Sequence, residues 1–405
     1  MARLDALATF TEVPGELTRR YLSPPHVEAT QQVAAWMRAA GMSVRTDPLL
    51  SVFGRYEGTS SRAPAIMLGS HIDSVVDAGR YDGALGVLGA ISVVEDLNRR
   101  GERLTHAIEV AAFGEEEGSR FPAHILTSSA VTGAVKPALF ELKDIDGVRV
   151  REALEQAGGN AKAYKACARK KGEIAAYLEL HIEQGPVLDN KGLALAAVTA
   201  INGSVRSLVK VTGFAGHAGT VPMDARRDAL TTASEMILAI ERLGRSEHDL
   251  MVTVGRIRAL PGAPNVIPGR VEFSVDMRSP RDNMRKRGHA ALLRELKQIA
   301  KARDAKLEVE TYQENPATPL HERVIQVVAD AIAACGQEPI RLSSGAGHDA
   351  GIMAKHCPSG MIFVRCKVGI SHNPAESITL EDADLGVAAM LEAVRGLDAT
   401  FRARG

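Results

Sequence analysis

The sequence predicts an α/β protein, with a mixed, largely parallel sheet covered by helices on both faces and with an inserted α+β domain. The strand-like segments of the first half are apolar throughout and alternate with helix-like segments, which is typical of a buried parallel sheet. From about residue 204 the strands alternate apolar and polar residues, as in a sheet with one exposed face. We therefore expect a discontinuous first domain, 1–203 and 318–405, interrupted by a second domain at 204–317.

The elements of the first domain follow from periodicity and end signals. Residues 26–40 have helical periodicity and stop at Gly41, a natural C-terminal cap. The other expected helices are 83–100, 321–335 and 380–396, and the expected strands are 63–68, 107–113, 175–180 and 361–366.

The insert is expected to form a split βαβ sandwich, because its elements follow the order β-α-β-β-α-β. The expected strands are 205–212, 250–258, 270–278 and 306–313, and the expected helices are 224–243 and 281–303.

The composition excludes several classes of protein. Lys+Arg and Asp+Glu both number 49, so the overall basic bias of a nucleic-acid binder is absent, and the short cluster Arg169–Lys171 is interpreted as a solvated turn. No window approaches the roughly 18 apolar residues of a membrane span. Four cysteines without close pairing indicate free thiols, and no secretory signal is visible, so we expect a cytoplasmic protein.

Acids and imidazoles follow the predicted strands of the first domain. In the segment Gly69–Asp73, positions two apart in an extended chain point the same way, so Asp73 can orient the ring of His71 for metal binding. The alternative is a histidine satisfied by a neighbouring carboxylate. Asp82 stands at the start of the helix 83–100, where a helix cap is the alternative to a bridging carboxylate.

Three adjacent acids, Glu115 to Glu117, follow the strand 107–113. They are costly to hold ionised together unless cations neutralise them, although a surface acidic run is the alternative. A metal hydrolase needs one such carboxylate as a ligand and one as a general base within reach of the attacking water.

Two more imidazoles stand in similar settings. His181 directly follows the strand 175–180, with Glu183 on the same side as a possible support, and His372 lies in the Gly- and Ser-containing segment 369–376. Each of the two is also compatible with a structural histidine when taken alone.

In order and over nearly the whole chain, these motifs resemble the amidohydrolase branch of the aminoacylase/carboxypeptidase-G metallopeptidase family. That branch contains allantoate amidohydrolases, N-carbamoyl-L-amino-acid hydrolases and β-ureidopropionases. The segment from His181 to Gly185, HIEQG, is characteristic of the ureido-cleaving branch, since the peptidase members commonly carry an acid at the position of His181. The resemblance implies a zinc-exopeptidase-like catalytic domain and an insert that serves as lid and dimerisation domain.

The resemblance also implies a binuclear centre with two divalent ions, zinc or manganese, in each subunit. The implied metal ligands are His71, Asp82, Glu117, His181 and His372. Asp82 would bridge the two ions, with His71 and His181 on one and Glu117 and His372 on the other. Glu116 would be the general base, and Asp73 would orient His71.

The substrate-binding residues implied by the resemblance are Arg206, His217, Asn265 and Arg278 in the insert, and Gln184 and His348 in the first domain. In the family, the histidine at position 217 reaches the active site of the partner subunit of a homodimer and polarises the scissile carbonyl. Asn265 and Arg278 match positions that hold the substrate's carboxylate. From the residues alone, a surface histidine in a tight turn and a surface ion pair of Arg278 are the alternatives.

The implied reaction is hydrolysis of the ureido C–N bond of a carboxylate-bearing substrate, releasing ammonia and carbon dioxide. Glu116 would take a proton from the water that the metals activate and return it to the departing nitrogen. The segments 216–223, 344–350 and 363–376 most resemble those of allantoate amidohydrolases, so we expect allantoate as the substrate. N-carbamoyl-L-amino acids, β-ureidopropionate, a small peptide and a non-catalytic binding role are the alternatives.

Overall fold

The computed structural model describes residues 1–402 and divides into two compact units. The first combines residues 1–199 with the chain from Pro319 onward, and the second is Ala200–Thr318. The insert expected at 204–317 lies within the second unit. In the described part of the chain, no helix has both the length and the apolar character that crossing a membrane requires.

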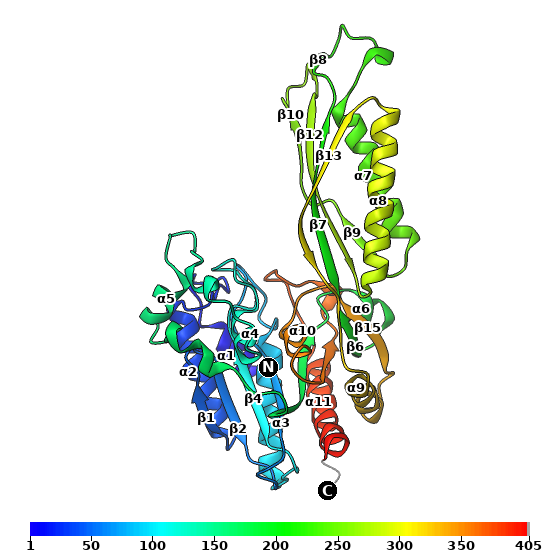
Figure 1. Ribbon diagram of the computed structural model, residues 1–405. Coiled ribbons are helices and arrows are strands. Elements are labelled where there is room, and N and C mark those ends of the chain that lie inside the picture. Colours follow the sequence, from blue (N-terminus) through cyan, green and yellow to red (C-terminus); the bar gives the residue numbers. More distant parts are fainter. Residues whose placement is uncertain (403–405) are drawn as a thin grey trace. The chain divides into compact units, whose positions relative to one another are not determined.

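A nine-stranded mixed sheet forms the frame of the first unit (Figure 1). Its strands are β1 (Ser43–Thr46), β2 (Val52–Tyr56), β3 (Ala65–His71), β4 (Ile108–Phe113), β5 (Ile174–Ile182), β6 (Leu195–Ile201), β14 (Thr318–Pro319), β15 (Ile340–Ser344) and β16 (Ser359–Val364). They follow the order β1-β2-β4-β3-β5-β16-β6-β14, and β15 also pairs with β6. The central strands β4, β3, β5 and β16 are parallel, and antiparallel strands flank them on both sides. Every residue of β3 and β4 is buried, so both faces of the sheet are covered. The predicted fold class is therefore confirmed.

The first unit contains nine α-helices within the described residues, and several of them pack on the sheet. They are α1 (Ala2–Ala8), α2 (Pro24–Ala39), α3 (Ala84–Arg100), α4 (Leu126–Val131), α5 (Val150–Gln156), α6 (Val187–Lys191), α9 (Glu322–Ala334), α10 (Asp349–Met353) and α11 (Leu380–Phe401). Short 3-10 turns occupy Pro137–Glu141, Ala161–Cys167, Met223–Ala225 (in the insert) and Lys367–Gly369. Helix α3 contacts β3, β4 and β5, and α11 contacts β3, β5 and β16. These contacts bury the strands that carry the candidate site.

The strands that sequence analysis missed are the flanking ones. β1 has the sequence SVRT and is mostly exposed, and β2, β6 and β15 pair antiparallel to their neighbours or lie off the main path. β1, β2 and β15 have only four or five residues, too few for a clear periodicity. β6 has the apolar run LAAVTAI, which was not predicted as a strand from the sequence.

The insert is an antiparallel sheet with two helices on one face (Figure 1). It contains β7 (Gly203–Thr212), α7 (Ala229–Ser246), β9 (Met251–Thr253), β10 (Ile257–Leu260), β12 (Arg270–Ser279), α8 (Asp282–Ala302) and β13 (Lys306–Asn315). The sheet order β10-β12-β7-β13 places the first strand between the third and the fourth, which is the split βαβ arrangement. A two-stranded ribbon, β8 (Gly216–His217) with β11 (Val266–Ile267), extends beyond the Thr212 end of β7.

Candidate metal centre and active site

The predicted ligands follow the carboxyl ends of the central parallel strands, where α/β proteins place their sites. His71 is the last residue of β3, and His181 is the penultimate residue of β5. Glu117 follows β4 within the turn at Gly114–Gly118, Asp82 precedes α3, and His372 lies on the loop between β16 and α11. Five segments, spread from residue 71 to residue 372, therefore supply the candidate ligands.

A first group consists of His71, His181 and Asp82, all of them buried. Asp82 Oδ1 lies 3.4 Å from His71 Nε2 and 3.1 Å from His181 Nε2. Two ligands that share a tetrahedral zinc ion at about 2.0–2.2 Å are roughly 3.3–3.6 Å apart. The His71 spacing lies within this range and the His181 spacing is slightly shorter, so both are close to what a common cation needs. The turn fits closely around them, because a Cβ on Gly83, which has a φ of 64°, would lie 2.4 Å from the ring of His71.

A second group consists of Glu117, His372 and the other oxygen of Asp82. His372 Nε2 lies 3.4 Å from Asp82 Oδ2 and 3.5 Å from Glu117 Oε2. Asp82 thus belongs to both groups, with one oxygen turned to each. That is the geometry of a carboxylate that could bridge two cations.

The imidazole tautomers also fit a metal. His71 Nδ1 lies 3.1 Å from the carbonyl oxygen of Asp73, and His181 Nδ1 lies 2.9 Å from that of Ile182. Protons on these Nδ1 atoms leave both Nε2 lone pairs directed at Asp82. Nε2 of His181 is buried and makes no hydrogen bond of acceptable geometry within residues 1–402. Lone pairs converging on a carboxylate oxygen need a proton or a cation between them.

The three adjacent acids, Glu115 to Glu117, lie in different surroundings. Glu115 has a φ of 56° and its Oε1 accepts the backbone N–H of Phe121 at 2.9 Å, so it is part of the turn. Glu116 and Glu117 instead lie with His71 in one group of potential ligands. The backbone N–H groups of these two residues donate to the Asp73 carboxylate at 3.3 and 3.2 Å. Asp73 therefore connects the acid turn to His71, whose Nδ1 is 3.6 Å from Asp73 Oδ1.

The electrostatics of this cluster favour positive charge. Burial raises the pKa of Glu116 well above its usual value, and the carboxylates Glu117 and Asp349 raise it further against the opposing effect of His71. Burial, reinforced by Asp82, raises the pKa of Glu117 to about 7. Hydrogen bonding to Asp82 raises the pKa of His372 to about 9. Glu116, Glu117 and His372 thus hold protons more tightly than usual. Burial also opposes the ionisation of Asp82, but its three histidine neighbours outweigh burial and lower the pKa of Asp82 well below its usual value. Carboxylates and imidazoles packed this closely form an environment suited to cations.

Gln184 lies beside the second ligand group. Its amide Nε2 donates to Asp82 Oδ2 at 2.7 Å, and its buried Oε1 accepts no hydrogen bond from any described residue. The backbone of Gln184 is left-handed, with a φ of 57°, a conformation that a non-glycine residue adopts only where its surroundings enforce it. Glu183, expected to support His181, is turned elsewhere and caps α6 through the N–H groups of Val187 and Leu188.

His348 contacts the candidate ligand His181. It is only 2% exposed, its ring centroid lies 4.4 Å from that of His181, and its Nε2 is 2.7 Å from Ser344 Oγ. This placement corresponds to a residue that supports His181, and its predicted contact with substrate stays a prediction.

The candidate residues of the insert divide between two places. His217 pairs with Val266 in the β8–β11 ribbon, and Ala218 N donates to Asn265 O at 3.0 Å, so His217 and Asn265 are neighbours. Arg206 and Arg278 lie toward the opposite end of the sheet and both bind Asp276, at 2.9 Å each. The run along β12 from residue 270 to residue 278 spans roughly 26 Å at about 3.3 Å per residue. One small substrate cannot contact both pairs in a single insert.

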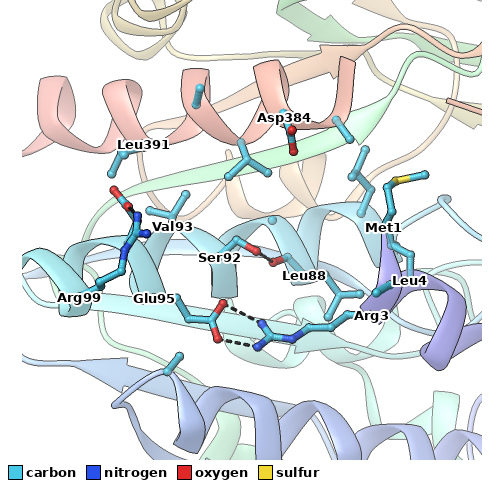
Figure 2. Close-up of a pocket in the computed structure, with 18 of the residues that line it drawn as sticks. Met1, Arg3, Leu4, Leu88, Ser92, Val93, Glu95, Arg99, Asp384 and Leu391 are labelled. Atoms are coloured by element: carbon cyan, nitrogen blue, oxygen red, sulfur yellow. Dashed lines mark hydrogen bonds and ion pairs between the residues drawn. The ribbon is translucent and has the colours of Figure 1, made fainter. Parts of the chain in front are cut away.

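A cavity of about 920 Å³ in the first unit is separate from these residues (Figure 2). It lies among α1, α3 and α11, and the bidentate ion pair of Arg3 and Glu95 crosses its wall. None of the predicted site residues lines it, so the chemistry of the side chains, not cavity size, identifies the site.

Fold and site together define a hydrolase of the metal-dependent type, with a discontinuous α/β unit that gathers imidazoles and carboxylates at its strand ends. Comparison with known proteins agrees. Residues 67–396 match the Peptidase family M20/M25/M40, and the chain belongs to this family. The family recognised from the sequence motifs is thereby confirmed.

Relatives place the chain within one branch of that family. It is 40% identical to an N-carbamoyl-L-amino acid amidohydrolase of Geobacillus stearothermophilus, over 94% of this chain and 93% of the relative. It is 37% identical to a probable allantoate deiminase of rice, Oryza sativa subsp. japonica, over 94% and 84%. The crystal structure of a hydantoinase/carbamoylase-family amidase from Burkholderia multivorans superposes with a TM-score of 0.92 at 33% identity, covering 97% of this chain and 95% of the other. The protein is an amidohydrolase of the carbamoylase and allantoate deiminase branch, which acts on C–N bonds.

Proposed function

We propose that the protein is a binuclear metal-dependent amidohydrolase that cleaves the ureido C–N bond of allantoate. The observation that carries the proposal is the pair of ligand groups joined at Asp82, with Glu116 beside them. His71 and His181 would hold one divalent ion, zinc or manganese, and Glu117 and His372 the other. Such ions, when bound, lower the pKa of a water and polarise a carbonyl oxygen.

Glu116 is the proposed general base. Its raised pKa suits a group that takes a proton from the attacking water and then returns it to the departing nitrogen. Asp73 would act before the reaction, by holding the His71 ring in the tautomer whose Nε2 can bind a metal. Burial opposes the ionisation of the Asp73 carboxyl, but the nearby His71 ring lowers its pKa, so an anion lies 3.6 Å from Nδ1 of His71.

Recognition of the ureido group and the carboxylate is assigned to the polar residues. The unpartnered Oε1 of Gln184 is an acceptor suited to a ureido N–H. The guanidinium of Arg278 suits bidentate binding of a carboxylate, and Arg206 is adjacent to it through Asp276. Asn265 would add a further donor from the partner subunit.

We propose further that His217 and Asn265 serve the active site of the partner subunit in a homodimer. The separation of roughly 26 Å between the two ends of the insert's sheet supports this division, because residues that act on one small molecule must come together. His217 would there stabilise the oxyanion of the attacked carbonyl. The four cysteines, all free, agree with the reducing cytoplasm as the proposed location.

A second candidate substrate is an N-carbamoyl-L-amino acid, which the Geobacillus relative favours by its name. Allantoate is preferred because the segments 216–223, 344–350 and 363–376 are most similar to those of allantoate amidohydrolases. Both substrates present a ureido group beside a carboxylate, so the metal centre alone does not separate them.

Ammonia release from a panel of ureido acids tests the proposal. The purified protein, depleted of metal and then resupplied with zinc or manganese, is expected to release ammonia from allantoate only after metal is restored. Turnover of N-carbamoyl-methionine without turnover of allantoate would replace the first substrate by the second. Activity that is unchanged by complete metal removal would overturn the metal-dependent mechanism.

A further inference from the structure

Two of the segments that supply candidate ligands meet at one buried carboxylate, that of Glu376, which is 4% exposed. Its Oε1 accepts hydrogen bonds from the backbone N–H groups of Tyr81 and Asp82, at 2.9 and 3.2 Å. Its Oε2 accepts a hydrogen bond from the hydroxyl of Ser371 at 2.8 Å. Glu376 therefore ties the turn before α3 to the loop that carries His372.

Ser371 extends this connection to the bridging carboxylate itself. Its hydroxyl oxygen lies 3.0 Å from Asp82 Oδ2, the oxygen turned toward the second ligand group. Because Ser371 immediately precedes His372, a single short segment contacts Asp82 and supplies its neighbouring ligand. Both the backbone and the side chain of Asp82 are thus held from one side by the segment 371–376.

The turn before α3 is shaped around Glu376. Gly83 is the N-cap of α3, and the two N–H groups that Glu376 accepts, those of Tyr81 and Asp82, lie immediately before it. A Cβ on Gly79 would lie 2.3 Å from both the Cβ and the carboxyl carbon of Glu376. No larger residue fits at position 79 unless Glu376 moves.

The two ligand groups depend unequally on this support. His71 and His181 stand on central strands and are each 1% exposed. The side chain of His372 is 50% exposed, and its backbone has a φ of 54°, which a non-glycine residue keeps only when its surroundings hold it. The central strands hold the histidines of the first group in place. His372 of the second group lies on a loop and therefore needs another contact to hold it.

We propose that Glu376 is a positioning residue that fixes the second ligand group, Asp82 Oδ2, Glu117 and His372, for a divalent cation. It acts through the backbone of Asp82 and through Ser371. The inference rests on the proposed function, because it takes the two ligand groups to be a binuclear centre. Loss of Glu376 should weaken the uptake of one metal equivalent much more than that of the other.

Metal titration of the full-length protein tests this proposal. Metal-depleted wild type and the variants E376A, E376Q and S371A are titrated with Co²⁺, followed by visible absorption and calorimetry. Wild type is expected to bind two equivalents. E376A should keep one near wild-type affinity and bind the other about 10- to 100-fold more weakly, as is usual when a residue supporting a ligand is removed. E376Q, which retains an oxygen for the two N–H groups, should lose less affinity than E376A.

The matched control is E381Q, which changes an exposed glutamate in the first turn of α11 and should bind both equivalents as wild type does. Wild-type affinity of E376A for both equivalents, or an equal loss of both, would overturn the inference. If E376A does not fold, the E376Q and S371A titrations decide, and wild-type behaviour of both would overturn it. If wild type binds two equivalents but hydrolyses no ureido acid, the proposed function fails, and the inference is then judged on the titrations alone. Fewer than two equivalents on wild type would overturn both.

Discussion

The first unit brings its candidate functional residues together, whereas the insert keeps its candidate residues apart. In the first unit, five ligand candidates from five segments converge until their nitrogen and oxygen atoms are 3.1 to 3.5 Å apart. In the insert, four residues predicted to bind one substrate lie in two pairs at opposite ends of a sheet. The candidate ligands therefore come together within one unit, whereas the candidate substrate-binding residues of the insert do not.

The reason for this difference lies in the two sheets. Parallel strands all present their carboxyl ends at the same edge, so residues that follow successive strands meet there. An antiparallel strand pair presents its turns at both edges, so residues near strand ends separate by the length of a strand. The predictions below test this contrast, from the largest expected effect to the smallest.

Replacing Glu116 with Gln should have the largest effect, because it removes the proposed base from the complete centre. We expect kcat to fall by up to about 10,000-fold, since the amide cannot accept the proton of the attacking water. Metal content, measured by elemental analysis, should remain that of wild type. A variant that keeps most of its turnover would remove Glu116 from the mechanism.

Mixing two inactive variants tests whether the insert acts in the partner's site. H71A and H217A should each lose activity, H217A by about 100- to 1,000-fold as expected for an oxyanion donor. Unfolded and refolded together in equal amounts, they should regain about one quarter of wild-type activity, because half of the dimers are mixed and each has one complete site. Separate refolding of each variant is the control. Mixtures no more active than the separate variants would place His217 in its own subunit's site.

Replacing Arg278 with Lys tests the other end of the insert's sheet. Lysine keeps the charge but loses the planar pair of donors, so KM for the ureido acid should rise by about 10- to 100-fold. The change in kcat should be smaller, because the carboxylate lies away from the reacting bond. A matched R270K substitution, at the opposite end of β12, should leave KM unchanged. An unchanged KM in R278K would remove Arg278 from substrate binding.

The metal-free protein should lose stability as the pH rises, an effect of only a few degrees in Tm. The folded-state pKa of Glu117, about 7, and that of His372, about 9, both lie above their ordinary values. Stability from such groups is fully present below the unfolded pKa and is lost as pH rises through the folded pKa. Tm, measured by calorimetry without metal, should therefore fall between pH 5 and pH 9. Added zinc should reduce or reverse this trend, since metal binding favours the deprotonated ligands.

Much of the fold and the site followed from the sequence because local signals were strong. The apolar runs before His71, Glu115 and His181 located the central strands to within a few residues. The residue types after those runs indicated metal chemistry before any geometry was known. The short strands β1, β2 and β15 were missed because four or five residues carry too little periodicity, and strand pairing rather than local sequence defines them.

The sequence by itself determined which residues end the parallel strands, and the rule that such ends share one edge made a metal centre predictable. Only the tertiary structure decided how neighbouring residues divide their roles. In the folded protein, Glu115 stabilises the turn, whereas Glu116 and Glu117 lie beside His71. Glu183 caps a helix, and Glu376 contacts Asp82, from which it is 294 residues away in the sequence. These roles depend on backbone conformation and long-range packing. The sequence alone does not distinguish them, because adjacent residues such as Glu115, Glu116 and Glu117 are of the same type.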